Sequence, residues 1–191
     1  MIYNKYILFN DQNINVISKE NKYTFKPSKI SYNNGIIINK EKFINEYTRF
    51  CKQHNLLKSK WLQKNLVIYN DICSLNDLRQ IKHTFNELNY KEVNYVSIKN
   101  IIKLTKKDSY ILGEENYRLH YIDKNNIKQV LNINKDIFTL KEITFLLNNK
   151  LKNKNLYILS EDKNFEKIIH NCNLNYFFSK KAEFLIKILK N

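Results

Sequence analysis

The sequence predicts an α/β fold of two similar lobes, each with the element order βββ-α-β-α-β-α. Three observations predict it. Strand-like runs separated by polar turns open each half of the chain, apolar positions at helical spacing follow, and the whole order of elements occurs twice. Because compact lobes of ~100 residues can each hold a core, we place the first lobe at residues 1–106 and the second at residues 107–191.

The first lobe opens with three strand-like runs, which predict an antiparallel meander. The runs are residues 3–10, 13–19 and 23–31. Pro27 lies in the third run and has no backbone N–H to donate, so we expect that strand at an edge of the sheet, or beginning at Pro27. Asn34-Gly35 is expected to turn the chain toward the first helix.

Helices and strands alternate through the rest of the first lobe. The first helix is expected from Lys40, with apolar positions at Phe43, Ile44, Tyr47, Phe50 and Cys51. The unbroken apolar run at residues 66–69 is typical of a central strand buried on both faces. Ser74 is expected to cap a second helix with an apolar stripe at Leu75, Leu78, Ile81, Phe85 and Leu88. A strand at 93–96 and a short helix at 98–104 complete the lobe.

The second lobe repeats this order from Ser109. A second meander is expected at residues 110–112, 117–122 and 127–133. A helix over 139–151 and a buried strand over 156–159 follow, and the chain ends with a helix at 163–170, a strand at 174–178 and a helix at 179–189. Such a duplication of element order is more specific than any short motif in the chain.

Glycine and cysteine usage excludes several kinds of site. Gly35 and Gly113 are the only glycines, so neither a P-loop nor a GxGxxG motif can be written on the chain. The cysteines Cys51, Cys73 and Cys172 lie far apart with no CxxC spacing, which favours reduced core thiols of a cytoplasmic protein. We expect no secretory signal and no transmembrane helix, because no apolar run approaches the ~18–20 residues of a membrane span.

Several local segments resemble the bacterial actins of the actin/hexokinase superfamily, most closely the MreB and FtsA type. YILFNDQNINV at 6–16 resembles the first phosphate hairpin, I-D-x-G-x-x-N-x-x-V, and PSKI at 27–30 resembles the P-S-x-[IV] that follows it. SYILGEENYRLHY, from residue 109, stands in place of the second phosphate hairpin, and LYILSEDKNFEKII, from residue 156, in place of the adenosine motif. The resemblance implies two ribonuclease-H-like lobes. Because the connections at 30–39 and 136–139 are short, it implies a minimal fold without the outer actin subdomains.

The departures from the family pattern fall on the nucleotide site that the resemblance implies. With Asn13 aligned to the family asparagine, Leu8 and Asn10 stand where the family has its metal-organising Asp and its close-approach Gly. The degenerate positions are Asn10, Asp11, Asn13, Gly113, Glu114 and Glu161. Carboxylates in the second hairpin would repel ATP. We therefore expect a pseudo-ATPase with no catalytic residue, no cofactor and no metal site.

Two other kinds of catalytic site were considered. Asp11 and Asp71 both follow strands expected to be neighbours, as in two-metal nucleases, but the third carboxylate that such a site needs has no clear candidate. Glu46 and Asp77 lie on helices of unknown facing, so turn formation is the simpler interpretation of both Asp residues. The four histidines have no metal-ligand spacing and no nucleophile motif beside them; they are His54, His83, His120 and His170.

Charge leaves a second class of function open. There are 33 Lys and Arg against 18 Asp and Glu, a net charge of +15, which attracts polyanions or reflects drift toward lysine codons. In the last helix, Phe184, Leu185, Ile188 and Leu189 form an apolar stripe flanked by Lys180, Lys181, Lys187 and Lys190. This helix could pack on the sheet or contact an anionic membrane from the cytoplasm.

The leading hypothesis is a non-catalytic actin-like scaffold or interaction protein in a bacterial cell-shape, division or envelope assembly. Its partners would be other proteins, such as another actin-like protein or a second copy of itself. One alternative is a basic nucleic-acid-binding protein without enzymatic activity, whose lysines neutralise phosphates without reading bases. A third hypothesis is an ATPase that still binds nucleotide in a degenerate cleft.

Overall fold

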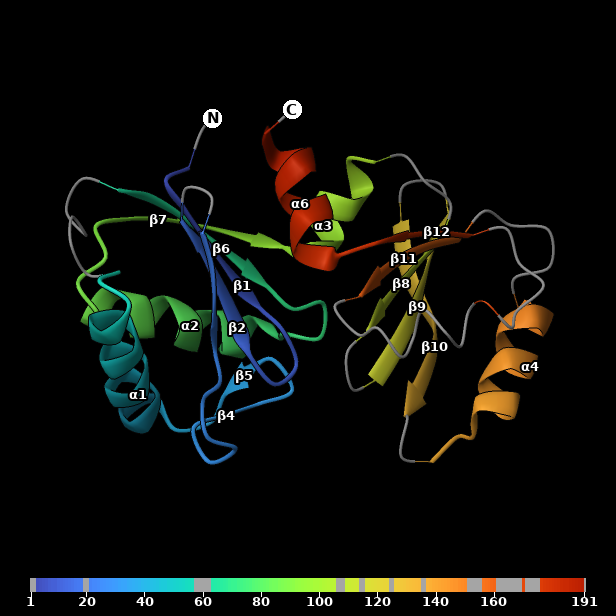
Figure 1. The fold of residues 1–191 in the computed structure, drawn as a ribbon, viewed down its shortest axis with the longest axis horizontal. Helices are drawn as coiled ribbons and strands as arrows, with labels where there is room; N and C mark the ends of the chain where they lie inside the picture. The colour runs from blue at the N-terminus through green and yellow to red at the C-terminus, as the bar shows by residue number, and fades with distance from the viewer. Residues whose placement is uncertain are drawn as a thin grey trace. The chain divides into compact units, whose positions relative to one another are not determined.

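The computed structural model describes residues 3–18, 21–56, 63–105, 109–113, 116–123, 126–134, 137–150, 156–160, 170 and 176–190. The chain divides into two compact units, Met1–Ile98 with Lys190, and Lys99–Leu189 (Figure 1). The division falls at the start of helix α3 (Ile98–Lys103), so this helix groups with the second unit and not with the first lobe, where we expected it.

The first unit is built on a five-stranded mixed sheet with the strand order β3-β2-β1-β6-β7. Its strands are β1 (Lys5–Phe9), β2 (Ile14–Ser18), β3 (Asn21–Phe25), β6 (Lys64–Tyr69) and β7 (Glu92–Ser97). The meander is antiparallel, and β1 runs parallel to β6 with Ile7 opposite Val67, as the sequence predicted. β3 is an edge strand that ends before Pro27, because proline cannot donate to a ladder.

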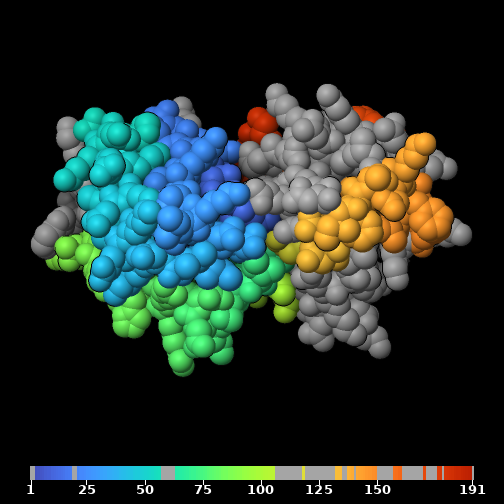
Figure 2. All heavy atoms as spheres, turned by 90° about the horizontal axis from the view of Figure 1, so that it is seen from below, coloured from blue at the N-terminus to red at the C-terminus, as the bar shows by residue number. Residues whose placement is uncertain are grey.

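A small hairpin joins β3 to the first helix, where the sequence predicted only a turn. Its strands are β4 (Tyr32–Asn33) and β5 (Ile36–Ile37). Asn34 and Gly35 between them have φ values of 49° and 80°, the left-handed pair that a two-residue hairpin turn requires. Figure 2 shows the segment of this hairpin and the two helices that follow lying on one face of the first unit.

Helices α1 (Lys40–Gln53) and α2 (Leu75–Glu87) pack on this sheet through one aromatic core. Asn39 caps α1, and Ser74 caps α2 in a capping box with Asp77. The core includes the rings of Phe9, Phe25, Phe43, Tyr47 and Phe85, with those of Phe43 and Tyr47 stacked 5.8 Å apart. The expected burial of Leu75 is wrong: this residue is 77% exposed, because it begins α2 before the helix reaches the core.

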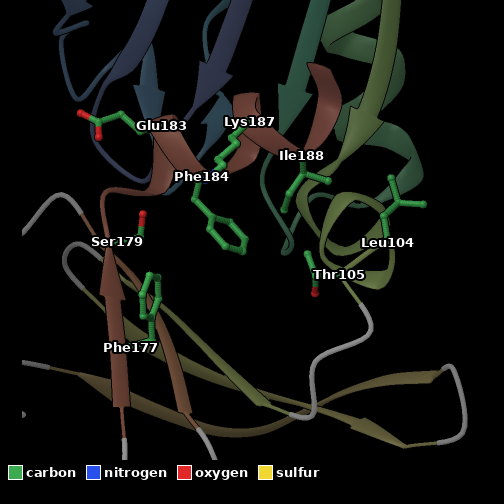
Figure 3. Close-up of a pocket in the computed structure, with 8 residues that line it drawn as sticks. All are labelled: Leu104, Thr105, Phe177, Ser179, Glu183, Phe184, Lys187 and Ile188. Atoms are coloured by element: carbon green, nitrogen blue, oxygen red, sulfur yellow. The ribbon is translucent and has the colours of Figure 1, made fainter. Parts of the chain in front are cut away.

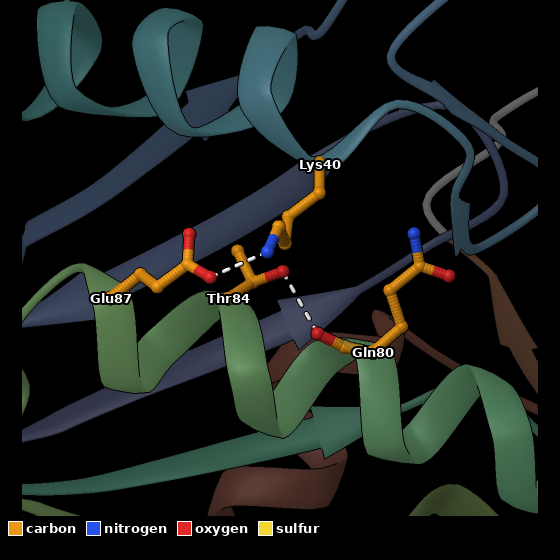
Figure 4. Close-up of polar contacts among 4 residues, drawn as sticks. All are labelled: Lys40, Gln80, Thr84 and Glu87. Carbon is orange, nitrogen blue, oxygen red and sulfur yellow. Dashed lines mark hydrogen bonds and ion pairs between the residues drawn. The ribbon is translucent and has the colours of Figure 1, made fainter.

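A polar contact also joins the two helices. The Lys40 ammonium, in the first turn of α1, lies 2.5 Å from a Glu87 carboxylate oxygen at the end of α2 (Figure 4). In α2, the Thr84 hydroxyl donates to the carbonyl of Gln80 at 2.8 Å, so this buried polar group is satisfied within its own helix.

The second unit repeats the sheet of the first, with the order β10-β9-β8-β11-β12. Its strands are β8 (Ser109–Gly113), β9 (Asn116–Asp123), β10 (Asn126–Asn134), β11 (Leu156–Ser160) and β12 (Tyr176–Ser179). β8 runs parallel to β11 with Tyr110 opposite Tyr157, the pairing that the duplicated order predicted.

Two further helices belong to the second unit. They are α4 (Leu140–Lys150) and, apart from Lys190, α6 (Lys181–Lys190). The helix expected at 163–170 lies outside the described residues, apart from its last position. Within the described ranges, no helix has the length and apolar character needed to cross a membrane.

Candidate functional site

The first two polar residues of the expected phosphate-binding turn lie between β1 and β2 and are buried. Asn10 and Asp11 are 0% and 1% exposed. The backbone N–H of Asn10 donates to the carbonyl of Asn13 at 2.9 Å, and the Asn10 amide donates to the Asn13 side-chain oxygen at the same distance. These bonds close the turn on itself. Leu8, which the resemblance would align with the metal-organising Asp, is 1% exposed in β1.

Asp11 is connected to the end of β6 across the sheet. The Asn70 side-chain amide donates to a carboxylate oxygen of Asp11 at 2.7 Å, and both residues are buried. β1 and β6 are parallel neighbours, so residues that follow them meet at the same edge of the sheet. The side-chain oxygen of Asn70 accepts the backbone N–H of Asp71 at 2.8 Å. Asn70 therefore uses both ends of its amide within this edge.

Gly35 brings the β4–β5 hairpin onto the same edge. Its backbone N–H donates to the carbonyl of Asp11 at 3.0 Å, and its own carbonyl accepts the Cys73 thiol at 3.6 Å. A side chain at this position would place its Cβ 2.7 Å from the Asn70 amide nitrogen and 2.9 Å from the Asn70 Cβ. Glycine is thus required both by the left-handed φ of 80° and by the close approach to Asn70.

We call this set, Asn10, Asp11, Asn13, Gly35 and Asn70, the polar junction. Tyr32 and Gln12 tie the hairpin to it from outside: the Tyr32 hydroxyl donates to the carbonyl of Asn10, and the Gln12 amide donates to the Asn33 side-chain oxygen at 3.1 Å. The sequence identified the turn residues but missed Asn70, Gly35 and Tyr32. Of these three residues, only Asn70 has a signal in the sequence that could have placed it at the site. Like Asp11, it lies at the end of a strand, and the two strands were expected to be neighbours.

Several donors at the polar junction are used by partners within the protein. The backbone N–H groups of Asn10 and Gly35, and that of Asp71 beside the junction, each donate to a carbonyl or side-chain oxygen of the same unit. Phosphate cradles need such N–H groups to point at the ligand. The side-chain oxygen of Asn10, buried and without a hydrogen-bond partner, is an acceptor and would repel a phosphate oxygen. The residues present do not fit a phosphate group in this turn.

The other carboxylates considered for a two-metal site have structural partners. Glu46 accepts the Ser31 hydroxyl at 2.5 Å and the Ser28 backbone N–H at 3.1 Å. Burial opposes the ionisation of Glu46, but these hydrogen bonds outweigh it and lower the pKa of its carboxyl. Asp77 is the capping-box residue of α2. Among the described residues, no three His, Cys, Asp or Glu side chains are grouped to hold a metal ion.

The histidines and cysteines lie in separate places. His54 packs against the rings of Tyr23 and Phe50, and the hydroxyl of Tyr176 lies 2.6 Å from His170 Nδ1. Cys51 is buried in the first core and Cys73 is partly buried; neither of these two is part of a disulfide. Cys172 lies outside the described residues.

In the second unit, the corresponding turn follows β8. Gly113 is the last residue of β8 and pairs with Ser160 at the end of β11. Glu114 and Glu161, the carboxylates expected there and at the adenosine position, lie outside the described residues.

Two five-stranded mixed sheets of the same order define an actin-like α/β fold, and the comparisons with solved structures agree with it. The chain is similar to the ethanolamine utilization protein EutJ from Carboxydothermus hydrogenoformans, at a TM-score of 0.68 and 8% identity, over 98% of this chain and 88% of that one. It is also similar to MreB5 of Spiroplasma citri bound to AMPPNP, at a TM-score of 0.50 and 10% identity, over 80% of this chain and 58% of that one. No protein-family model and no curated protein sequence matches the chain. The predicted actin-like fold is therefore confirmed.

Proposed function

We propose that this actin-like protein is non-catalytic and serves as a scaffold or interaction protein in a bacterial cell-shape, division or envelope assembly. The observation that carries the proposal is the closed polar junction, in which the Asn70 amide holds the Asp11 carboxylate at 2.7 Å and the Gly35 N–H donates to the Asp11 carbonyl. The assembly role itself comes from the resemblance to MreB and FtsA.

The comparison with MreB5 sharpens the argument against nucleotide chemistry. That protein is described bound to AMPPNP, so the fold can hold a nucleotide. Here the family's acidic residue is replaced by Leu8, which is buried and cannot organise a metal ion. The turn that would approach the phosphates instead donates the Asn10 N–H to Asn13 within its own hairpin, and Asp11 accepts hydrogen bonds from the Asn70 amide after β6 and from the Gly35 N–H. A protein that keeps the fold without this chemistry acts through its surfaces.

The partners that fit this role are proteins with a similar fold, either another actin-like protein or a second copy of this chain. Sedimentation velocity over a range of protein concentrations tests self-association directly. Co-expression with an actin-like protein of the same cell, followed by co-purification, tests the other arrangement.

Titration with ATP and Mg²⁺ in a calorimeter tests the loss of nucleotide binding. We expect no binding heat and, at 1 mM ATP, no shift in the melting temperature. The melting measurement covers binding that happens to be athermal, because a site with a Kd of about 10 μM would stabilise the protein by about 2.7 kcal/mol at that concentration. A Kd in the low micromolar range by either measurement would overturn the proposal.

A further inference from the structure

The second unit contains an open hollow of about 730 Å³ that lies outside the polar junction. Its walls come from the end of α3, from β12 and from α6 (Figure 3). Phe177 and Ser179 alternate on β12 and so share one face of the strand. Phe184 and Ile188 lie one turn apart on α6 and so share one face of the helix. Figure 3 shows the rings of Phe177 and Phe184 projecting into the hollow.

Helix α6 carries more apolar surface than the unit buries. Ala182 and Leu185 are 1% and 0% exposed, so they hold the helix in place. Phe184 and Ile188 are only partly buried, and both line the hollow. The sequence predicted one continuous apolar stripe, packed on the sheet or facing a membrane, but the structure divides it between a buried face and a face along the hollow.

The opposite walls are also apolar and exposed. Phe177 is 55% exposed and Leu104 is 66% exposed, although both are large hydrophobic side chains. Exposed apolar side chains that converge on one concave site are typical of ligand-binding sites. The volume of about 730 Å³ lies within the range of roughly 300–1,000 Å³ found for small-molecule pockets.

The polar groups of the hollow favour an anionic head group. Lys187 lines the hollow and has no ion-pair partner among the described residues. The negative charge of Glu183 is offset by Lys180, whose ammonium lies 3.4 Å from a Glu183 carboxylate oxygen. The Thr105 hydroxyl already donates to the carbonyl of Ile102 at 2.7 Å, which leaves Lys187 and the Ser179 hydroxyl as donors. A ligand that satisfies both must present acceptor oxygens.

We propose that this hollow binds a small amphipathic anion, with an acyl-sized apolar body between Phe177 and Phe184 and an acidic head group at Lys187. The occupant is a single soluble molecule, because the hollow has the volume of one such ligand and, among its described lining residues, Lys187 is the one cation. The net charge of +15 favours the approach of an anion. The proposal goes beyond the scaffold role and does not depend on it.

Dodecanoate is the probe, used below the concentration at which it forms micelles, with dodecanol as its uncharged analogue. Titrations of the full chain are followed by calorimetry and by ligand-detected NMR. We expect saturable one-to-one binding of dodecanoate. Lys187→Gln should weaken dodecanoate binding about tenfold and leave the affinity for dodecanol unchanged, since the substitution removes only the charge-assisted contact.

Phe177→Ala should weaken the binding of both dodecanoate and dodecanol about tenfold, because the substitution removes part of the apolar wall. Matched controls are Lys141→Gln and Phe145→Ala on α4, where Lys141 is exposed and Phe145 is 66% exposed. Neither should change binding.

Three outcomes would overturn the proposal: dodecanoate binding that does not saturate, equal effects of Lys187→Gln and Lys141→Gln, or Phe177→Ala without effect. Vesicles of phosphatidylglycerol and phosphatidylcholine provide a further arm. Binding to these vesicles without binding of soluble dodecanoate would refute the single-molecule ligand in favour of a membrane surface.

Discussion

Replacing Gly35 with alanine tests whether the polar junction is a close-packed structural element. Alanine at a φ of 80° costs about 1–2 kcal/mol for the left-handed backbone alone. The new methyl group would also lie 2.7 Å from the Asn70 amide nitrogen, which must then move away from Asp11. Losing that buried hydrogen bond adds about 1–3 kcal/mol. We therefore expect Gly35→Ala to destabilise the first unit by about 2–5 kcal/mol.

Two companion variants separate the backbone strain from the clash. Asn34 also has a positive φ, 49°, but its side chain is exposed, so Asn34→Ala should cost only about 1 kcal/mol. In an Asn70→Ala background the amide is gone and only the 2.9 Å approach to the Cβ of residue 70 remains, so Gly35→Ala should cost less there than in the parent protein. The double-mutant cycle of Gly35 and Asn70 should give a coupling energy of about 1–3 kcal/mol.

The assay must report on the first unit itself, because the chain divides into two compact units and the substitutions lie in the first. Cys51 is 0% exposed in the aromatic core of that unit, so iodoacetamide reaches it only when the unit opens. The extent of its alkylation at increasing urea, read by mass spectrometry of the Cys51 peptide, gives the free energy of opening. The reasoning fails if Gly35→Ala costs no more than Asn34→Ala, or if its cost is unchanged in the Asn70→Ala background.

Three further predictions concern pH and charge. Burial raises the pKa of Tyr95 to about 12, and its hydroxyl has no hydrogen-bond partner. The contribution of Tyr95 to the free energy of unfolding is complete below the unfolded pKa of 10.0 and is lost as the pH rises toward 12. Tyr95→Phe should therefore leave the stability at pH 7 unchanged. It should also reduce the loss of stability at alkaline pH, measured by urea titrations. The lowered pKa of Glu46 gives the opposite pH dependence: its contribution to the free energy of unfolding is present above pH 4.5 and is lost as the pH falls. Glu46→Gln should remove this pH dependence and cost about 1–2 kcal/mol at pH 7, measured by the same titrations. If the net charge of +15 reflects composition, DNA binding in a gel-shift assay should be weak, salt-sensitive and indifferent to sequence; tight binding to one sequence over competitor DNA would favour the nucleic-acid alternative.

The strand order could be predicted because it depends on local patterns. The uninterrupted run of β6, with four consecutive buried residues from Asn65 to Ile68, indicated a central strand, and the polar turns fixed the meander. The duplicated order then placed β11 beside β8 in the same way. Sheet topology follows from such patterns because connections are short and crossovers are right-handed.

The polar junction could not be predicted because it depends on contacts between distant residues. Asn70 and Asp11 are 59 positions apart, and no periodicity links them. The same is true of Lys5, whose ammonium is buried and donates to the carbonyl of Leu56 at 2.9 Å. Lys181 was grouped with the lysines that flank the apolar stripe of the last helix, but it is 1% exposed and does not contribute to an exposed basic face.

The way the first unit is stabilised would allow the actin-like fold to persist without phosphate chemistry, as the proposed non-catalytic role requires. Its aromatic core joins α1 and α2 to the sheet, and Tyr32 of this core donates its hydroxyl to the Asn10 carbonyl in the turn between β1 and β2. That turn is also held by the amide of Asn70 and by the backbone N–H of Gly35. A nucleotide in this position would have to break both contacts and would gain no metal-organising carboxylate in return, since Leu8 is buried there. The junction thus does for the fold what a bound phosphate could otherwise do: it joins the first hairpin, the β4–β5 hairpin and β6 at one edge of the sheet.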